Sequence, residues 1–250
     1  MVLTSINCGA IMEKSYKYKR ILLKISGEAL KGQEKGSFSA EAVSLIVEKV
    51  KTVIDNGVEV ALVCGAGNIW RGKVGAGNGM DRVTADYMGM LATVMNALCL
   101  KDAFDAAGVG AEVQSSIPMQ PVANRFNREN AIKALERGKV VIFAGGTGSP
   151  FFTTDTTAAL RALETYCDAV LKATKVDGIY SADPVLYPES ERFETISFEE
   201  ALSSKLAIMD STAFSMCRDN ELPIIVFNFS DPESLEQVLE GDTSRATIVE

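Results

Sequence analysis

Two lysines stand near the ends of apolar runs, where an ammonium group is costly to bury. Lys24 follows the letters ILL within residues 19–26, and Lys172 follows AVL within residues 168–173. A charged side chain among buried residues is unfavourable unless it faces water or meets a counter-ion. Both lysines are therefore candidates for anion binding. The alternatives are an edge strand that exposes Lys24 to water and a surface excursion that begins after Lys172.

The segment GGTGSPFFTTD, residues 145–155, joins an apolar run to a helical pattern and is typical of a phosphate-binding turn. Its three glycines allow the backbone to approach a ligand closely. Thr153, Thr154 and Asp155 fall at the expected helix start, where unpaired N–H groups attract anions. The segment has no lysine, so it is not the common G-x-x-x-x-G-K-[ST] loop. Lys24 and Lys172 are the candidate sources of the missing positive charge.

A second glycine cluster, GAGNIWRG at residues 65–72, also follows an apolar run. It is not the dinucleotide fingerprint, because Trp70 stands where G-x-G-x-x-G requires the last glycine. Its backbone amides and the guanidinium fork of Arg71 are suited to a phosphate. An ordinary tight turn is the alternative.

Simpler structural roles are open for several of these residues. Asp155 fits a helix N-cap, and Asp210, in AIMDSTAF, is placed to cap the helix that follows it. Phe151 and Phe152 are expected to pack in the core rather than to stack on a base. The methionines at positions 88, 90 and 95 follow a helical spacing, which indicates core or subunit packing rather than a cofactor site.

Composition narrows the chemistry further. The chain has no histidine, which excludes Ser-His-Asp and Cys-His nucleophilic machinery and histidine-ligated metals. Its net charge of −8 argues against a broad surface for nucleic acid or an anionic membrane. The five cysteines are widely spaced and form no C-x-x-C, so neither a disulfide framework nor structural zinc is expected. A reducing cytoplasm fits this pattern.

The first 18 residues are expected to differ in order from the rest of the chain. Residues 1–18 lack the long apolar segment of a signal peptide, and we interpret them as a poorly ordered extension in which Met12 is an alternative start. No apolar stretch is expected to reach the roughly 18 residues that a membrane span needs. Residues 19–250 contain no linker or repeat and are interpreted as a single domain.

Strands and helices alternate along this domain. Strands are expected at 19–26, 58–64, 111–115, 139–144, 168–173, 223–228 and 246–249. Helices are expected at 39–55, 81–107, 128–137, 155–166, 197–204, 210–220 and from Asp231 as cap, with Pro232 first, to Gly241. This order predicts an α/β fold with a mostly parallel sheet between helices. Ligands bind at the carboxyl ends of such strands, where the lysines and the glycine turns should converge.

Six segments stand in a distinctive order: KRILLKISGEAL, GAGNIWRG, DYMGMLATVMN, AGGTGSPFFTTDT, LKATKVDGIYSADP and MDSTAF. In this order they resemble the bacterial UMP kinases, hexameric enzymes of the amino acid kinase superfamily. The resemblance covers residues 18–250. Acetylglutamate kinase and aspartokinase share the fold but have different loops. The resemblance implies a three-layer αβα sandwich with a central mostly parallel sheet, an acceptor-binding N-terminal half and an ATP-binding C-terminal half.

The same resemblance implies transfer of the ATP γ-phosphoryl group to UMP with Mg²⁺, giving UDP for pyrimidine biosynthesis in a cytoplasmic homohexamer. It assigns ATP binding to Lys24, Ile25, Ser26, Gly27, Gly67, Arg71, Thr174, Tyr180 and Asp183. It assigns UMP binding to Ala66, Asp86, Thr147, Gly148, Ser149, Pro150, Phe151, Phe152, Thr153 and Thr154. It assigns catalysis to Lys24, Lys172, Asp155, Asp210 and Arg71, with no metal-ligating residue. Within these sets, Asp86 would hold the ribose and Asp210 would orient the lysines.

The sequence departs from the family pattern at three places. Ala66 stands where glycine is usual, which adds a methyl group to the second glycine loop. Tyr87 stands where many members have histidine. Residues 32–37 fall in the region associated with GTP activation in some members, and their sequence does not predict such activation. Inhibition by UTP is an expectation from the family alone.

The implied reaction needs no histidine. The second pKa of a phosphate monoester is about 6, so the attacking oxygen of UMP is mostly ionised at neutral pH. An alcohol acceptor, in contrast, needs a base. The remaining task is to hold two polyanions in line, which lysines, Mg²⁺ and backbone amides can do. Two other classes stay open, namely a kinase of this fold for another small anionic acceptor and a nucleotide-binding or storage protein without activity.

Overall fold

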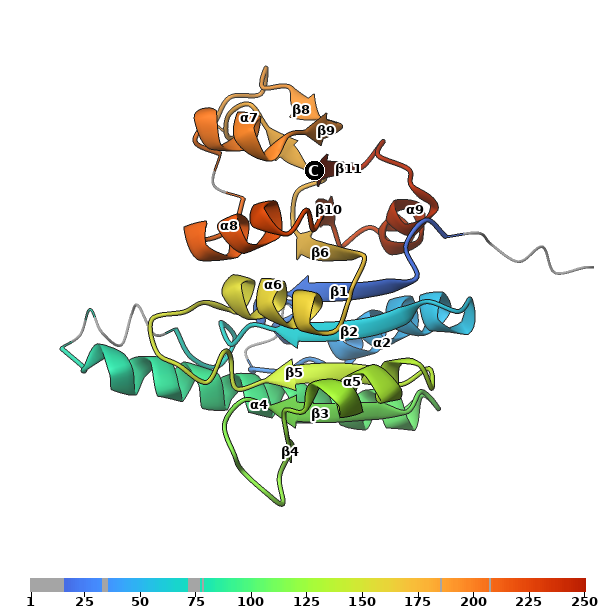
Figure 1. Cartoon of the computed structure of the whole chain (residues 1–250), viewed down its shortest axis with the longest axis vertical. Coiled ribbons are helices and arrows are strands. Elements are labelled where there is room, and N and C mark those ends of the chain that lie inside the picture. The colour runs from blue at the N-terminus through green and yellow to red at the C-terminus, as the bar shows by residue number, and fades with distance from the viewer. Residues whose placement is uncertain (1–15, 33–35, 72–76, 78, 185, 207) are drawn as a thin grey trace, which may run out of the picture.

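One mixed sheet spans the molecule from end to end (Figure 1). The structure is a computed structural model that describes residues 16–32, 36–71, 77, 79–184, 186–206 and 208–250. Its nine-stranded sheet has the order β4-β3-β5-β2-β1-β6-β10-β11-β9. All neighbours in it are parallel except the pair β10 and β11. The sheet joins strands from both halves of the chain, and a single domain over residues 19–250 stays a prediction.

The strands of this sheet are β1 (Arg20–Ile25), β2 (Glu59–Cys64), β3 (Ala111–Ser115), β4 (Asn124–Arg125), β5 (Val140–Ala144), β6 (Ala169–Thr174), β9 (Thr195–Ile196), β10 (Ile224–Asn228) and β11 (Ala246–Val249). A separate pair consists of β7 (Ile179–Tyr180) and β8 (Arg192–Phe193). The helices are α1 (Glu28–Lys31), α2 (Ala40–Asp55), α4 (Arg82–Ala106), α5 (Arg128–Leu135), α6 (Thr154–Glu164), α7 (Phe198–Ser203), α8 (Ser211–Asp219) and α9 (Ser234–Glu240).

Helices cover both faces of the sheet, and the alternation of side chains along β1 shows how. Ile21, Leu23 and Ile25 belong to a core that includes buried residues of α2, α4 and α9. Leu22 belongs to the opposite core, with buried residues of α5, α6, α7 and α8. The predicted three-layer α/β fold is therefore confirmed. Lys24 has the same parity as Leu22, which directs it toward the layer that contains α6.

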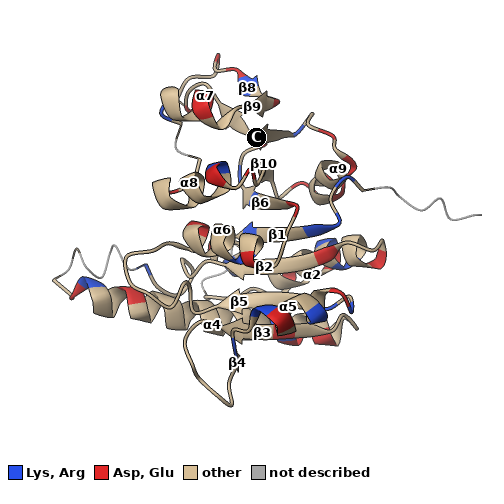
Figure 2. Ribbon diagram, viewed as in Figure 1, with Lys and Arg blue, Asp and Glu red and all other residues tan. Residues whose placement is uncertain are grey.

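Charged residues avoid the middle of the sheet. Figure 2 shows Lys, Arg, Asp and Glu mainly on helices and connections, while the central strands are mostly tan, the colour of all other residues. Among the buried side chains, β1, β2, β5 and β10 contribute almost only aliphatic and aromatic residues. Lys24 on β1 and Lys172 on β6 are therefore exceptions among the apolar residues of the central strands, as the sequence pattern indicated.

Most expected elements appear close to their expected bounds, and the differences have local causes. The two-residue strands β4, β7, β8 and β9 were not predicted, because so short a strand shows no periodicity. The four-residue helix α1, which follows Gly27 directly, was not predicted either. The last helix begins at Ser234 rather than Pro232, and Asp231 accepts a hydrogen bond from the N–H of Glu233 outside it. Gly241 ends that helix with φ 87°, as predicted.

The start of the described chain packs on α9. Tyr18 is buried, the N–H of Lys17 donates to the carbonyl of Leu239, and the Tyr16 hydroxyl donates to Glu236. The expectation of a poorly ordered extension concerns residues 1–18, of which residues 1–15 lie outside the described part of the chain.

Helix α4 is long and apolar enough to cross a membrane, judged by length and composition alone. The expectation that no stretch would reach this threshold is wrong. However, α4 packs Val94, Ala97, Leu100 and Phe104 into the core under the sheet. It is therefore the core helix of an α/β domain in this structure.

Candidate functional site

The two lysines predicted to bind an anion are neighbours across the sheet. Strands β1 and β6 are parallel and in register at Lys24 and Lys172. The Nζ atom of Lys24 lies 2.8 Å from Oδ1 of Asp155, and Lys172 Nζ donates to Oδ2 of the same carboxylate at 2.9 Å. Lys172 also donates to the carbonyl of Ile208. We call Lys24, Asp155 and Lys172 the lysine–aspartate cluster.

The topology explains why the cluster forms here. The chain order reverses at β1, which has β2 on one side and β6 on the other, and a ligand crevice is expected at such a switch point. Helix α6 packs on β1, β2 and β6 and directs its N-terminus to this edge. Thr153 caps the helix by accepting from the N–H groups of Asp155 and Thr156. The alternative that Asp155 is itself the N-cap is therefore wrong, and its carboxylate is available to the lysines.

Burial and charge act in opposite directions on the cluster. Burial alone would raise the pKa of Asp155, but the positive charges of Lys24 and Lys172 outweigh it and lower the pKa. Burial lowers the pKa of Lys172, and the negative charge of Asp155 opposes this effect only in part. Two ammonium groups thus share one largely buried carboxylate. The excess positive charge of the cluster makes it suitable for binding an anion.

The loop between β5 and α6 has the backbone that its glycines predicted. Gly145, Gly146 and Gly148 have φ values of 74°, 57° and 83°, a region that other residues rarely adopt. A Cβ atom on Gly145 would also lie 2.8 Å from Oγ of Ser115. Glycine is therefore required both for the turn and for its close packing on the end of β3.

The two phenylalanines of this loop are exposed, so the expectation that they pack in the core is wrong. The exposed fractions are 65% for Phe151 and 48% for Phe152. Phe151 has φ 72°, and the guanidinium of Arg82 lies 5.5 Å from its ring centroid. A non-glycine residue in this conformation is strained, and such strain is common in ligand-binding segments.

Two cavities lie near the lysine–aspartate cluster, one lined by Thr153 and Thr154, which precede Asp155, and the other by Lys172 itself. The first, about 170 Å³, lies between α4 and the β5–α6 loop, and we call it the α4 cavity. Its lining includes Ala66, Asp86, Thr147, Ser149, Phe152, Thr153 and Thr154. The second, about 570 Å³, lies beside the end of β6, and we call it the β6 cavity. Its lining includes Lys172, Thr174, Tyr180, Asp183, Ile208 and Val226.

Comparison with known proteins shows the family to which the chain belongs. The sequence profile described as the amino acid kinase family matches residues 19–228. The chain belongs to the amino acid kinase family. Its fold is similar to the crystal structure of UMP kinase from Bacillus anthracis, with a TM-score of 0.89 and 35% identity over 93% of this chain and 96% of that one. It is also similar to UMP kinase from Ureaplasma parvum, with a TM-score of 0.88 and 38% identity over 92% of this chain and 98% of that one.

The family's expected acceptor residues gather at the α4 cavity, and their hydrogen bonds show how they are held. Both carboxylate oxygens of Asp86 accept from Nε of Arg82 at 2.9 Å, and one also accepts from the N–H of Phe151 at 2.8 Å. Thr147 and Ser149 bond to each other within the loop. Gly148, Pro150 and Phe151 belong to the same loop but do not line the cavity.

The residues expected to bind ATP fall into two groups. Thr174, Tyr180 and Asp183 line the β6 cavity. The others lie at the carboxyl end of β1 and the loop after β2, namely Lys24, Ile25, Ser26, Gly27, Gly67 and Arg71. The side chain of Ile25 is fully buried, so only its backbone is available to a ligand. Arg71 lies 2.8 Å from Glu28 of α1, and its hydrogen bond lowers the pKa of that carboxyl group.

Asp210 has the expected capping role, whereas its expected role in orienting the lysines stays a prediction. It caps α8 by accepting from the N–H groups of Thr212 and Ala213. It also accepts from the hydroxyls of Thr153 and Thr156 on α6. Within the described residues it makes no hydrogen bond to either lysine, but its negative charge weakly opposes the lowering of the Lys172 pKa by burial. Asp210 therefore ties the start of α6, and with it Asp155, to the start of α8.

The sequence analysis missed Arg82 and Thr93. Arg82 orients the Asp86 carboxylate, and the four-residue spacing of the two on one helix was the available signal. Thr93 is buried on α4 and its hydroxyl accepts from the N–H of Gly145 at 2.9 Å. A polar residue inside the apolar pattern ATVMNAL was the signal in that case.

The described residues offer no cluster of three or more acidic, cysteine or histidine side chains for a metal ion. Both oxygens of Asp155 form ion pairs with ammonium groups, which compete with a cation. This donor set does not fit a metal site built by the protein alone.

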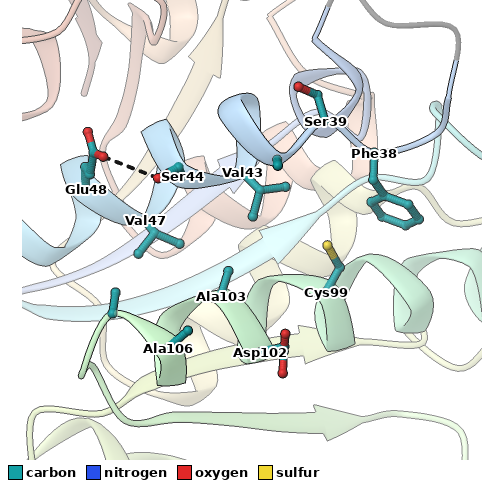
Figure 3. A pocket seen from close by; sticks show the side chains of 12 residues that line it. Phe38, Ser39, Val43, Ser44, Val47, Glu48, Cys99, Asp102, Ala103 and Ala106 are labelled. Carbon is teal, nitrogen blue, oxygen red and sulfur yellow. Dashed lines mark hydrogen bonds between the residues drawn. The ribbon is translucent and has the colours of Figure 1, made fainter.

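A third cavity, about 620 Å³, lies between α2 and α4, away from the cluster. Figure 3 shows Val43, Val47, Cys99 and Ala103 directed into it from the two helices. None of the predicted site residues lines it.

Proposed function

We propose that this chain is a UMP kinase that transfers the γ-phosphoryl group of ATP to UMP. The observation that carries the proposal is the position of the lysine–aspartate cluster. Lys172 lines the β6 cavity, and Thr153 and Thr154, next to Asp155, line the α4 cavity. ATP in the β6 cavity and UMP in the α4 cavity would therefore direct their phosphates to the same two ammonium groups.

The proposed mechanism is electrostatic. Two unit charges 4 Å apart interact by about 4 kcal/mol at an effective dielectric constant near 20, so the two phosphate groups repel strongly. Lys24 and Lys172 offset this repulsion and stabilise the charge that moves from donor to acceptor. Asp155 keeps both ammonium groups in place between turnovers, and Asp210 fixes Asp155 through Thr153. The UMP phosphate is already ionised, so the chain supplies no base.

The nucleoside parts would be held away from the reacting groups. We assign the UMP ribose to Asp86 and the UMP phosphate to the loop Thr147–Thr154 with Ala66. We assign the ATP base and ribose to Thr174, Tyr180 and Asp183. The ATP phosphates are assigned to the backbone of Ile25–Gly27 and Gly67, with Arg71 nearby. Mg²⁺ is expected to enter as the ATP complex, since Mg²⁺ commonly binds substrate phosphates with few protein ligands.

We further propose that the chain forms a homohexamer. Helix α4 carries an exposed apolar stripe of Tyr87, Met88, Leu91 and Met95, with exposed fractions between 37% and 53%. Their spacing places them on one face of the helix, which suits helix packing against another copy. Light scattering of the purified chain tests the mass, and Leu91→Glu should reduce it if this stripe is an interface. An unchanged mass in that variant would remove the stripe from the assembly.

The proposed setting is the cytoplasm. The described cysteines, Cys64, Cys99, Cys167 and Cys217, are all free thiols, which suits a reducing compartment. Inhibition by UTP is proposed on the family resemblance alone, and GTP activation is not proposed.

A coupled assay of ADP formation tests the function. UMP should support turnover with ATP and Mg²⁺ far better than CMP, N-acetylglutamate or aspartate. Turnover of one of the other acceptors in place of UMP would assign a different kinase activity. Tight ATP binding without turnover of any acceptor would indicate a nucleotide-binding protein instead.

A further inference from the structure

Asn96 is a fully buried amide on a helix whose other buried residues are almost all apolar. A buried amide is unfavourable unless its hydrogen bonds are made. Here they all are. Its Nδ2 donates to the carbonyl of Gly65 at 2.6 Å and to Oδ1 of Asn68 at 2.9 Å. Its Oδ1 accepts from Nδ2 of Asn68 at 3.0 Å.

The partner amide extends this network to a third segment. The second hydrogen of Asn68 Nδ2 is donated to the carbonyl of Ser37 at 2.8 Å. The two asparagines therefore join α4, the loop after β2 and the segment before α2. A reciprocal amide pair of this kind has a single arrangement that satisfies all its groups, so it fixes the position of the loop.

The loop held in this way presses on the turn after β1. A Cβ atom on Gly27 would lie 2.4 Å from Oδ1 of Asn68 and 2.5 Å from the Gly65 carbonyl oxygen. On the other side, a Cβ atom on Gly65 would lie 3.6 Å from Oγ1 of Thr154. Gly65 thus lies between the turn assigned to ATP phosphates and the helix start assigned to UMP.

The hydrogen bond to Gly65 also sets the direction of one peptide group. In a planar trans peptide the C=O and N–H point in opposite directions. The Gly65 carbonyl points at Asn96, so the N–H of Ala66 points away from it. No described residue accepts a hydrogen bond from that N–H, and Ala66 lines the α4 cavity.

We propose that Asn96 is a positioning residue that holds the Gly65–Ala66 peptide with its N–H directed at the transferring phosphoryl group. This inference rests on the proposed kinase activity and adds a donor to the two lysines. The amide of Ala66 touches the phosphoryl group, and Asn96 acts through it. A backbone donor placed in advance is effective because it needs no reorganisation during the reaction.

The test compares Asn96→Asp and Asn96→Ala with Leu100→Ala in the full-length chain. Asn96→Asp keeps the shape but, when ionised, cannot donate to the Gly65 carbonyl. Leu100 is also fully buried on α4, one turn further along and outside the network. Its truncation is therefore the control for the loss of stability that the Asn96 variants are expected to show. The kcat per folded molecule is measured at a temperature well below unfolding.

Both Asn96 variants should lower kcat at least about tenfold, with smaller changes in the KM for UMP and ATP, since small displacements of reacting groups have effects of this order. Leu100→Ala should keep kcat within about twofold of the unmodified chain. A kcat per folded molecule within twofold in both Asn96 variants would overturn the proposal.

Amide hydrogen exchange separates this inference from the proposed function. The N–H groups of Ile69 and Trp70 donate to the carbonyl of Ala66 inside the loop. Their exchange should accelerate in both Asn96 variants beyond any change in Leu100→Ala. If the unmodified chain does not phosphorylate UMP, the proposed function fails, and equal exchange in all variants would then overturn the positioning role as well.

Discussion

The two cavities beside the lysine–aspartate cluster are held in different ways. The loop at the α4 cavity is fixed by distant side chains, because Thr93 bonds Gly145 and Asp86 bonds Phe151 from another element. At the β6 cavity, the Tyr180 hydroxyl donates to Asp177, three residues away, and the Thr174 hydroxyl donates both to Val176, two residues away, and to the carbonyl of Phe227 on β10. The α4 side is therefore preorganised by side chains of another element, whereas on the β6 side Thr174 is tied to the sheet and Tyr180 depends on its own local turn.

This difference has a consequence for specificity. A preorganised wall discriminates strongly between ligands, because a wrong ligand leaves fixed polar groups unpaired. A wall of local turns can adjust at low cost. Substitutions at the α4 cavity should therefore affect the acceptor sharply, and those at the β6 cavity should affect ATP mildly. The lysine–aspartate cluster, which is proposed to meet the phosphates of both substrates, should show the largest effects.

Removing either lysine of the cluster should have the largest effect of all. Lys24→Ala or Lys172→Ala should lower kcat about 100- to 1000-fold, the cost of losing one preorganised donor to developing charge. The KM values should change much less, since the lysines meet charge that moves during transfer. Steady-state kinetics measure both parameters. Lys51→Ala, which removes an exposed lysine paired with Asp55, is the matched control. Near-normal kcat in both cluster variants would contradict the assignment.

Asp86→Asn should have the next largest effect and should act on the acceptor. It keeps the size of the side chain but loses the charge that orients Arg82 and holds Phe151. The KM for UMP should rise about tenfold, in line with the loss of a charged hydrogen bond. The KM for ATP should stay within about twofold, as should kcat. Asp55→Asn on α2 is the control, and a fall in kcat with an unchanged KM for UMP would contradict the static role.

The pH profile should show a smaller but specific effect. Burial lowers the pKa of Lys172 below its usual 10.5, so its proton is lost at lower pH than from an exposed lysine. The protonated form is the active one, and kcat/KM, which reports the free enzyme, should therefore fall on the alkaline side below pH 10.5.

Lys172→Arg sharpens this prediction. Arginine keeps its charge to a pH above about 12. The alkaline fall in kcat/KM should then move to higher pH, whatever the absolute rate of the variant. If the alkaline fall in kcat/KM occurs at the same pH in Lys172→Arg as in the unmodified chain, the titration of another group causes it.

Tyr180→Phe should have the smallest effect, on the β6 side. It removes a hydroxyl that donates to Asp177 at 2.7 Å, a neutral-to-charged contact within one local turn. A loss of about 1 kcal/mol corresponds to a rise of about fivefold in the KM for ATP. The KM for UMP should not change. Tyr187→Phe, an exposed tyrosine in the same segment, should leave both unchanged. A rise in the KM for UMP in Tyr180→Phe would erase the distinction between the two cavities.

The sequence was most informative where one residue type contradicts its surroundings. Lys24 and Lys172 interrupt apolar strands, and the glycines after β5 interrupt a strand-to-helix connection. Both signals are local. The sequence could not predict that both lysines pair with the same carboxylate. Asp155 is far from Lys24 in the chain, and the register of β1 and β6 is a property of the folded sheet.

The failures have the same physical origin. Phe151 and Phe152 are hydrophobic, and hydrophobicity alone predicts burial, but the glycine turn before them directs both outward. Thr153 and Asp155 are both good capping residues, and only the backbone decides that Thr153 caps α6. The strands β7 and β8 are two residues each, and their pairing depends on contacts that no local pattern carries.

The most direct test of the central claim is a crystal structure with UMP and a non-hydrolysable ATP analogue. The account predicts Nζ of both Lys24 and Lys172 within about 2.7–3.2 Å of phosphate oxygens, with the ATP analogue in the β6 cavity and UMP in the α4 cavity. Phosphates bound elsewhere, with both ammonium groups still paired with Asp155 and in contact with no phosphate oxygen, would contradict it.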